Sequence, residues 1–207
     1  MIIYCLNCCI FYNLDKINCA YSSTTISLYF SRAEKGFAVN KILYERGIYP
    51  EEKFTERNIF GFTRKFVDIP EIVEYLNHFF SQLSVWLLKE EVDRVVLVIG
   101  SIKQNQDLER WQFQINTRTQ SVAMSTDNVN SEVHGIDAQI NSCITTMIPL
   151  EELCSFNLIV YANTQCDTPQ NWHECNEHYI SNAEECILKS VSTPCHEVNL
   201  AFCYKQL

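Results

Sequence analysis

The fold of this chain is decided by the stretch Leu108-Glu109-Arg110-Trp111-Gln112-Phe113-Gln114-Ile115. From Arg110 onward polar and apolar side chains alternate, which is typical of a strand with one buried face and one wet face. An unbroken apolar run, Val95–Ile99, comes before it, and the polar segment 100–107 separates the two. This arrangement predicts a β-hairpin with its turn in residues 100–107.

Helical spacing of apolar residues predicts two helices before this hairpin. The first runs from about Phe30 and ends at Gly47, because glycine tolerates the left-handed conformation at a helix end. The second begins where Asp68 and Glu71 have the spacing of a capping box, with Pro70 in the first turn. Its apolar stripe consists of Ile72, Tyr75, Leu76, Phe79, Leu83, Trp86 and Leu87.

A third helix and two further strands are expected after the hairpin. The polar stretch 116–130 is interpreted as a loop. The helix that follows is marked by Val133, Ile136, Ile140, Ile144 and Met147, and Pro149 closes it. Alternating residues then predict strands at Cys154, Phe156, Leu158 and Val160, and at Val198, Leu200, Phe202 and Tyr204. The order of elements indicates an α+β fold with three helices packed on a largely antiparallel sheet.

Size and charge limit the classes of function. A chain of 207 residues with 47% hydrophobic composition can bury one sizeable core, so one domain is expected. The formal net charge of -9 argues against non-specific attraction to phosphate backbones, and no nucleic-acid partner is expected. The apolar opening, residues 1–14, is too short to span a membrane and has no basic residue before Lys16, so no membrane association is expected.

The chain has 11 cysteines but no Asn-x-Ser/Thr site, and we interpret the cysteines as reduced thiols of a cytosolic or nuclear protein. Residues 1–26 form an atypical N-terminal tail that we expect to lie outside the domain and to be dispensable for folding. Cysteines crowd in that tail at positions 5, 8, 9 and 19. A second group of potential ligands is Cys166, His173, Cys175, His178, Cys186, Cys195 and His196. Their spacings match no compact zinc module, but a Cys-dependent redox or zinc protein remains an alternative.

Motifs of enzymes are absent from the sequence. The five glycines are far apart, so there is no phosphate-cradling loop, and neither a Gly-x-Ser-x-Gly nor a His-Glu-x-x-His motif occurs. We therefore expect neither a catalytic residue nor a cofactor.

Several stretches occur together in an order that resembles a known family. They are the hairpin strand, Lys41–Pro50, Leu153–Tyr161, Ser181–Glu185 and His196–Asn199. In order and spacing they resemble the HORMA domains of spindle-checkpoint proteins, over about residues 27–207. The resemblance implies an adaptor whose sheet edge binds a short extended peptide. It also implies a mobile C-terminal segment, the safety belt, at about 162–207, which wraps across the bound peptide.

The resemblance assigns the peptide-binding edge strand to Ser155, Phe156, Asn157, Leu158, Ile159, Val160 and Tyr161. In the belt it singles out Trp172, His196 and Val198, with Trp172 as an aromatic anchor in a polar segment. Two forms are implied: an open form, in which the belt occupies the peptide edge, and a closed form, in which the belt wraps the peptide.

Partners are implied by the resemblance as well. They are the WD-repeat coactivator of the anaphase-promoting complex, a coiled-coil kinetochore receptor, a checkpoint kinase-like partner and a self-dimer of open and closed forms. Ala138 and Gln139 on the third helix, and Arg46, are the implied dimer or partner contacts. Ala138 stands where the family usually has arginine, so weak dimerisation is expected. The implied locations are nucleus, kinetochore and cytoplasm.

A rival within the same fold is the HORMA adaptor subunit of translesion polymerase zeta, which uses a belt for a different peptide. Trp111 and Trp172 favour the checkpoint branch.

Overall fold

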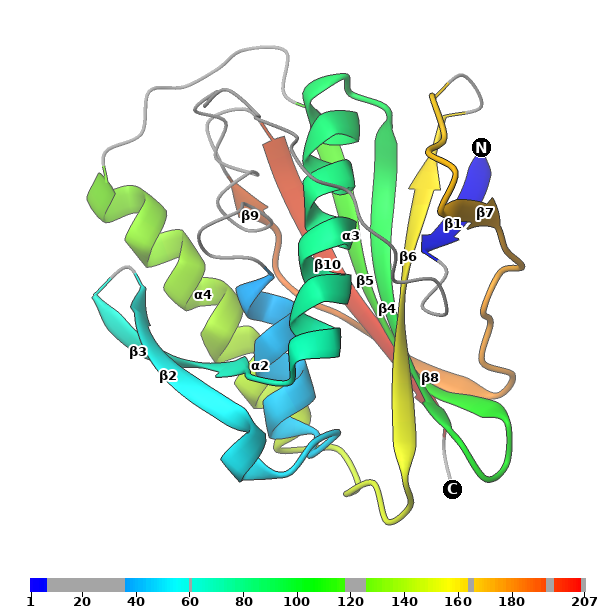
Figure 1. Ribbon diagram of the computed structural model, residues 1–207. Helices are drawn as coiled ribbons and strands as arrows, with labels where there is room; N and C mark the ends of the chain where they lie inside the picture. Colours follow the sequence, from blue (N-terminus) through cyan, green and yellow to red (C-terminus); the bar gives the residue numbers. More distant parts are fainter. Residues whose placement is uncertain (7–35, 60, 118–125, 164–165, 193–195, 206–207) are drawn as a thin grey trace.

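In the computed structural model, helices cover one face of a large sheet (Figure 1). The structure describes residues 1–6, 36–59, 61–117, 126–163, 166–192 and 196–205. None of the helices in these ranges is long and apolar enough to cross a membrane.

The described helices are α2 (Phe37–Glu45), α3 (Pro70–Leu88) and α4 (Thr126–Ile144), with a short 3-10 helix at Glu51–Lys53. The first five strands are β1 (Ile2–Leu6), β2 (Phe54–Ile59), β3 (Phe62–Val67), β4 (Val92–Ser101) and β5 (Gln106–Thr117). The remaining strands are β6 (Cys154–Ala162), β7 (Trp172–Glu174), β8 (Ala183–Ile187), β9 (Val191–Ser192) and β10 (His196–Lys205).

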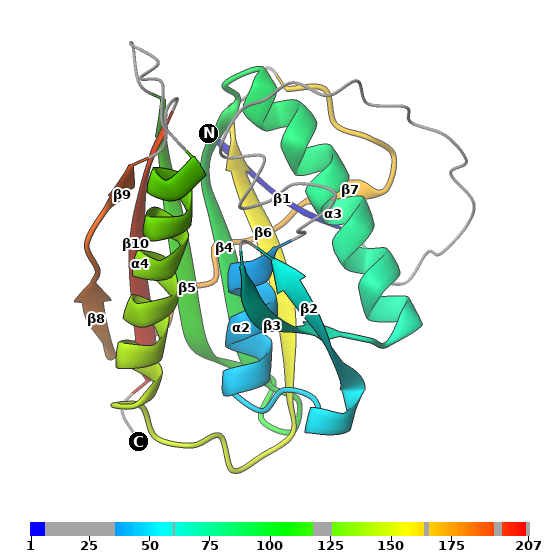
Figure 2. The same ribbon diagram turned by 90° about the vertical axis from the view of Figure 1, so that its left-hand side faces the viewer.

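The main sheet has 8 strands and runs in the order β7-β1-β6-β4-β5-β10-β8, with β9 paired to β10. Its pairs are antiparallel. Strands β1 and β7 therefore lie at one end of the sheet, and β8 and β10 at the other (Figure 2). Strands β2 and β3 form a separate hairpin beside α2. The α+β class and the antiparallel hairpin β4–β5 are confirmed.

The core lies between the helices and the sheet. The apolar stripe of α3 is confirmed at most positions, because Tyr75, Leu76, Phe79, Leu83, Trp86 and Leu87 are buried. Facing them, Val95, Leu97 and Ile99 of β4 and Trp111 of β5 are fully buried. Burial of this much apolar surface is the main favourable contribution to folding.

Three expectations about helix ends are wrong. The N-cap of α3 is Ile69 without a side-chain cap, so Asp68 and Glu71 do not form the expected capping box, although Pro70 does occupy the first turn. Helix α4 begins at Thr126, inside the stretch interpreted as a loop, and it ends at Ile144, before Met147. The residues in the first turns of α4 are mostly polar, so no apolar residues at helical spacing predicted a helix there.

The expectation that residues 1–26 lie apart from the domain is wrong for its first residues. Ile2–Leu6 form strand β1 within the main sheet, and Tyr4, Cys5 and Leu6 are buried. Residues 7–26 lie outside the described ranges, as does the expected start of the first helix near Phe30.

Gly36 and Gly47 flank α2 and offer a matched test of packing at its start. Both have positive φ, 61° and 64°, but a Cβ at Gly36 would overlap the buried Phe80 ring, whereas a Cβ at Gly47 meets nothing within 4 Å. We expect Gly47→Ala to cost about 1–2 kcal/mol of unfolding free energy, for backbone strain. Gly36→Ala should cost about 1–3 kcal/mol more, for overpacking. Urea denaturation measures both, and equal losses would contradict this packing.

Candidate functional site

Strand β6 is the centre of the candidate site, because its two edges are used differently. One edge pairs with β4 along the whole strand, from Cys154↔Ser101 to Ala162↔Val92. The other edge pairs with β1 over Ile159–Ala162. All the residues predicted for the peptide-binding edge, Ser155 to Tyr161, lie in β6. Leu158 to Tyr161 are buried, while Ser155 is exposed.

The N-terminal strand β1 fills the space beside β6 and is itself covered. It is antiparallel to β6, with Tyr4 opposite Val160 and Ile2 opposite Ala162. On its far side β7 pairs with it through Leu6↔Trp172, and the Cys175 N–H donates to the Ile3 carbonyl at 3.0 Å. A short extended segment is thus held by main-chain hydrogen bonds on both sides.

A side chain of α3 contacts the β6 backbone next to the residues that pair with β1. The Leu158 N–H donates to the Tyr75 hydroxyl at 3.2 Å, and this hydroxyl donates to Asn157 Oδ1 at 3.4 Å. Among the described residues, β1 pairs with β6 as far as Ile159, and Tyr75 of α3 serves the backbone donor of the next residue, Leu158.

On the helix side of the sheet, aromatic rings enclose the extended segment. The Tyr4 ring stacks on Trp86 with 5.7 Å between centroids, and Trp172 meets Trp86 edge-on at 4.7 Å. Phe79 lies 5.3 Å from Trp172. Trp172 is therefore buried and packs against α3. The role as a belt anchor that the family resemblance implied stays a prediction.

On the other side of the sheet, two thiols and an imidazole meet. Cys5 Sγ lies 3.1 Å from His173 Nε2. A hydrogen bond from the Cys175 thiol holds the pKa of Cys5 below its ordinary value, although burial acts in the opposite direction. The same hydrogen bond and burial raise the pKa of Cys175. Cys5 and Cys175 pack with Val96, Val98 and Ile159 of the sheet.

The belt passes from one end of the sheet to the other. Near its start, Trp86 Nε1 donates to the Asp167 carbonyl at 3.1 Å. After β7 the chain crosses toward the hairpin β4–β5, where His178 Nδ1 and Asp107 Oδ2 are 2.8 Å apart. It then forms β8 at the opposite end of the sheet, beside β10 (Figure 1).

The other predicted belt and helix residues lie at that opposite end. Val198 is buried and pairs with Ile115, and the backbone of His196 pairs with Thr117. Gln139 of α4 accepts a hydrogen bond from the Lys189 N–H at 2.6 Å, which ties the belt to this helix. Ala138 is exposed. Its role and that of Gln139 in a dimer stay predictions.

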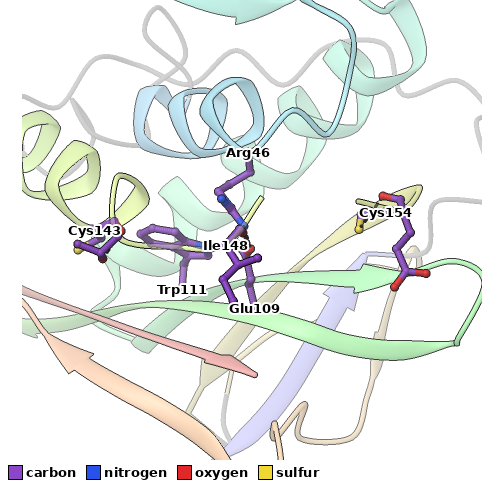
Figure 3. Close-up of polar contacts among 8 residues, drawn as sticks. Arg46, Glu109, Trp111, Cys143, Ile148 and Cys154 are labelled. Atoms are coloured by element: carbon purple, nitrogen blue, oxygen red, sulfur yellow. Dashed lines mark hydrogen bonds and ion pairs between the residues drawn. The ribbon is translucent and has the colours of Figure 1, made fainter. Parts of the chain in front are cut away.

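Arg46 lies in the interior (Figure 3). Its Nε donates to Glu109 Oε1 at 2.8 Å, and its Nη2 donates to the Ile148 carbonyl at 2.7 Å. Trp111 Nε1 donates to the other oxygen of Glu109 at 3.3 Å. This buried pair joins the end of α2 to β5 and to the segment that leads into β6. A partner contact of Arg46 stays a prediction.

Breaking the Arg46–Glu109 pair should be costly. We expect Glu109→Leu to destabilise the protein by about 3–5 kcal/mol, because it leaves a buried guanidinium without its counter-ion. The double variant Arg46→Met/Glu109→Leu should be less destabilised than the sum of the single variants by about 1–3 kcal/mol. Urea denaturation gives these values.

The same substitution at Glu45, which pairs with Lys41 on the surface of α2, serves as the control and should have little effect. Additive losses at Arg46 and Glu109 would show that the two side chains do not depend on each other.

The structure also locates the cysteines and histidines. Within the described ranges, no three or more His, Cys, Asp or Glu side chains are placed together to hold a metal ion. Cys5, His173 and Cys175 are brought together. His178 lies beside Asp107 instead, and Cys186 lies in β8. Cys8, Cys9, Cys19 and Cys195 lie outside the described residues.

Comparison with protein families identifies this architecture. A HORMA domain family model matches residues 36–196. The chain therefore belongs to the HORMA domain family. Mitotic spindle assembly checkpoint protein MAD2A of Mus musculus is 37% identical to it over 175 residues, which cover 82% of this chain and 85% of the relative. Within the family, the chain falls in the branch of the spindle checkpoint protein MAD2.

Solved structures agree with this assignment. A chain of the mitotic checkpoint complex crystal structure superposes with a TM-score of 0.76 at 33% identity, covering 82% of this chain and 93% of that chain. The Caenorhabditis elegans protein HTP-2, solved bound to the HIM-3 closure motif, gives a TM-score of 0.63 at 11% identity, covering 83% and 86%. The second similarity shows a shared fold.

Sequence reasoning missed the segment that occupies the site. Ile2–Leu6 is a continuous apolar run without alternation, because both faces of β1 are covered. Such a run is compatible with a strand buried on both faces, and its length favours a strand over a helix. That signal was present, but it did not reveal which strand β1 would join.

Proposed function

We propose that this chain is a spindle assembly checkpoint adaptor that captures a short peptide of the WD-repeat coactivator of the anaphase-promoting complex and delays anaphase. The same site would take a peptide of the coiled-coil kinetochore receptor. The protein acts by binding, in the nucleus, at kinetochores and in the cytoplasm, and a checkpoint kinase-like protein is a further proposed partner. Its relatives are spindle checkpoint proteins, and one structural neighbour belongs to the mitotic checkpoint complex.

One observation carries the proposal: an extended segment lies between β6 and the belt strand β7. Strand addition of this kind supplies affinity through main-chain hydrogen bonds and selectivity through pockets for alternate side chains. The docked segment has both kinds of contact. Val160 and Ala162 pair with it through the main chain, and Trp86 stacks on its Tyr4 ring. A partner peptide would use this edge in the same manner.

The position of the belt supports a closed form. The terminal strand β10 pairs with β5 and leaves the β6 edge to an extended segment. In the open form the belt itself would occupy that edge, so exchange of peptide would require the belt to open. Side-chain contacts between this crossing, which leads from β7 to β8, and the rest of the domain include His178 with Asp107 and Arg110 over the Tyr179 ring.

Binding to overlapping synthetic peptides that span the coactivator tests the proposal by fluorescence polarisation. We expect one short peptide to bind and a sequence-scrambled version of it to fail. If no coactivator or receptor peptide binds, the proposed partners are wrong.

Loss of the belt anchor should shorten the life of the complex. We expect Trp172→Ala to raise the peptide off-rate by about tenfold or more, because removing contacts worth about 1.4 kcal/mol changes an equilibrium tenfold. Trp172→Phe keeps an aromatic ring near Trp86 and should have a smaller effect. Surface plasmon resonance on the immobilised peptide measures the rates. An unchanged off-rate together with a collapsed thermal transition would make Trp172 a core residue only.

The proposed self-association should be weak. An arginine on α4 can form bidentate charge-assisted contacts that the exposed Ala138 lacks, and the neighbouring Gln139 already bonds the belt backbone. We expect Ala138→Arg to strengthen association of peptide-bound with peptide-free protein by about tenfold or more. Analytical ultracentrifugation of the mixture measures it. A tight wild-type dimer that Ala138→Arg leaves unchanged would refute this role for the helix.

A further inference from the structure

We infer that the chain's own N-terminal strand, Ile2–Leu6, is a built-in ligand of the β6 edge that competes with partner peptides for it. The inference rests on the proposed function, because it takes the β6 edge as the peptide site. It adds a regulatory element: the site of a single molecule is occupied until this strand leaves. The side chains of this strand also indicate which side chains of a partner peptide the site accepts.

Strand β1 and a partner peptide cannot both pair with the β6 edge, because they need the same backbone groups. The outward N–H and C=O groups of β6 can pair with one strand at a time, and β1 takes them in the register Ile2↔Ala162 to Cys5↔Ile159. Strand β7 then pairs with β1 and has no direct pairing with β6. A partner peptide added to this part of the edge must therefore displace β1 from both neighbours.

Side chains of β1 fit the site as those of a ligand would. The Tyr4 ring stacks on Trp86, and its hydroxyl meets the side chains of Thr168 and Cys166 in the belt. Tyr4 is 5% exposed and Leu6 8%. Cys5 points to the opposite face, where it contacts His173 and Cys175. The site thus has an aromatic pocket with polar groups at its end, and on the other face a place for a small side chain.

The connection is long enough for the strand to reach the edge of its own domain. Residues 7–35 join β1 to Gly36, and a chain spans up to about 3.5 Å per residue. A domain of this length has a radius of gyration of about 17 Å. A tethered ligand acts at an effective concentration of up to about millimolar. A strand of modest intrinsic affinity would therefore stay docked most of the time.

Docking weakens binding of any competing peptide by a calculable factor. If nine molecules in ten have β1 in place, the apparent Kd of a partner peptide rises about tenfold. Removing β1 from the edge, and changing nothing else, should restore the intrinsic affinity.

Fluorescence polarisation with the 207-residue chain tests this. The probe is a fluorescein-labelled synthetic peptide of residues 1–6 with serine in place of Cys5. The Tyr4→Glu variant would place a carboxylate against Trp86, and we expect it to bind the probe at least about tenfold more tightly than the wild type. Ile102→Glu introduces the same charge at an exposed position of the β4–β5 turn and should bind as the wild type does.

Coactivator peptides separate failure of this inference from failure of the proposed function. If they bind the wild type and Tyr4→Glu equally, β1 does not compete and the inference is overturned, while the proposed function stands. If they bind neither protein, the proposed function fails and the inference falls with it. Tighter binding of both probe and coactivator peptide to Tyr4→Glu supports both.

A second measurement needs no variant that disturbs packing. Diamide takes two hydrogens from a pair of neighbouring thiols and leaves a disulfide, so it should link Cys5 to Cys175 in the wild-type chain. Trypsin alone leaves Cys175 in the peptide 119–189 with four other cysteines, whereas trypsin together with Glu-C places it in the short peptide 175–177. Mass spectrometry of this double digest of the monomeric band from a non-reducing gel identifies the link to peptide 1–16, and saturating coactivator peptide should reduce its yield at least severalfold. Cys5→Ser is the control that must abolish it.

Absence of the Cys5–Cys175 link would show that β1 is not docked beside β7. The same link found only in a covalent dimer would show that the strand comes from a second copy. Either result would overturn the inference that β1 is an intramolecular ligand of the β6 edge.

Discussion

The structure depends on one constraint, which is that the outer edge of β6 carries backbone N–H and C=O groups that need partners. A sheet edge with unpaired groups invites another strand, and natural proteins cover such edges. Here β1 pairs with Ile159–Ala162, the Tyr75 hydroxyl accepts from Leu158, and β7 closes the far side of β1. The path of the belt follows from this constraint, because the chain must pass around the strand at the β6 edge before it reaches β10.

Trp86 connects the edge to the helix layer. Its ring contacts Tyr4 of the docked strand and Trp172 of the belt, and its indole N–H donates to the Asp167 carbonyl. One fully buried side chain of α3 therefore holds both the ligand-like strand and the segment that covers it. Aromatic pairs contribute about 0.5–1.5 kcal/mol each beyond burial, so filling the edge and closing the belt stabilise each other. The proposed switch between open and closed forms requires such mutual dependence.

The sequence predicted the parts of the fold that have strong local periods. The strand with Trp111, Phe113 and Ile115, the stripe of α3 and the alternation in β6 and β10 all appear in the structure. Predictions failed where the local signal was weak or absent. The polar start of α4 and the charged strand β2 carry little apolar pattern, so the first was interpreted as a loop and the second was not predicted. The N-cap of α3 is Ile69, one residue after the expected Asp68.

By itself the sequence determined the α+β class, the family resemblance and the position of strand β6, because alternation and helical spacing are properties of neighbouring residues. Only the tertiary structure decided what lies against that edge. It placed Ile2–Leu6 beside residues 159–162, paired the buried Arg46 with Glu109 and brought Cys5 to Cys175. These contacts join residues far apart in the chain, and their partners are selected by the packing of the whole domain, which no local pattern records.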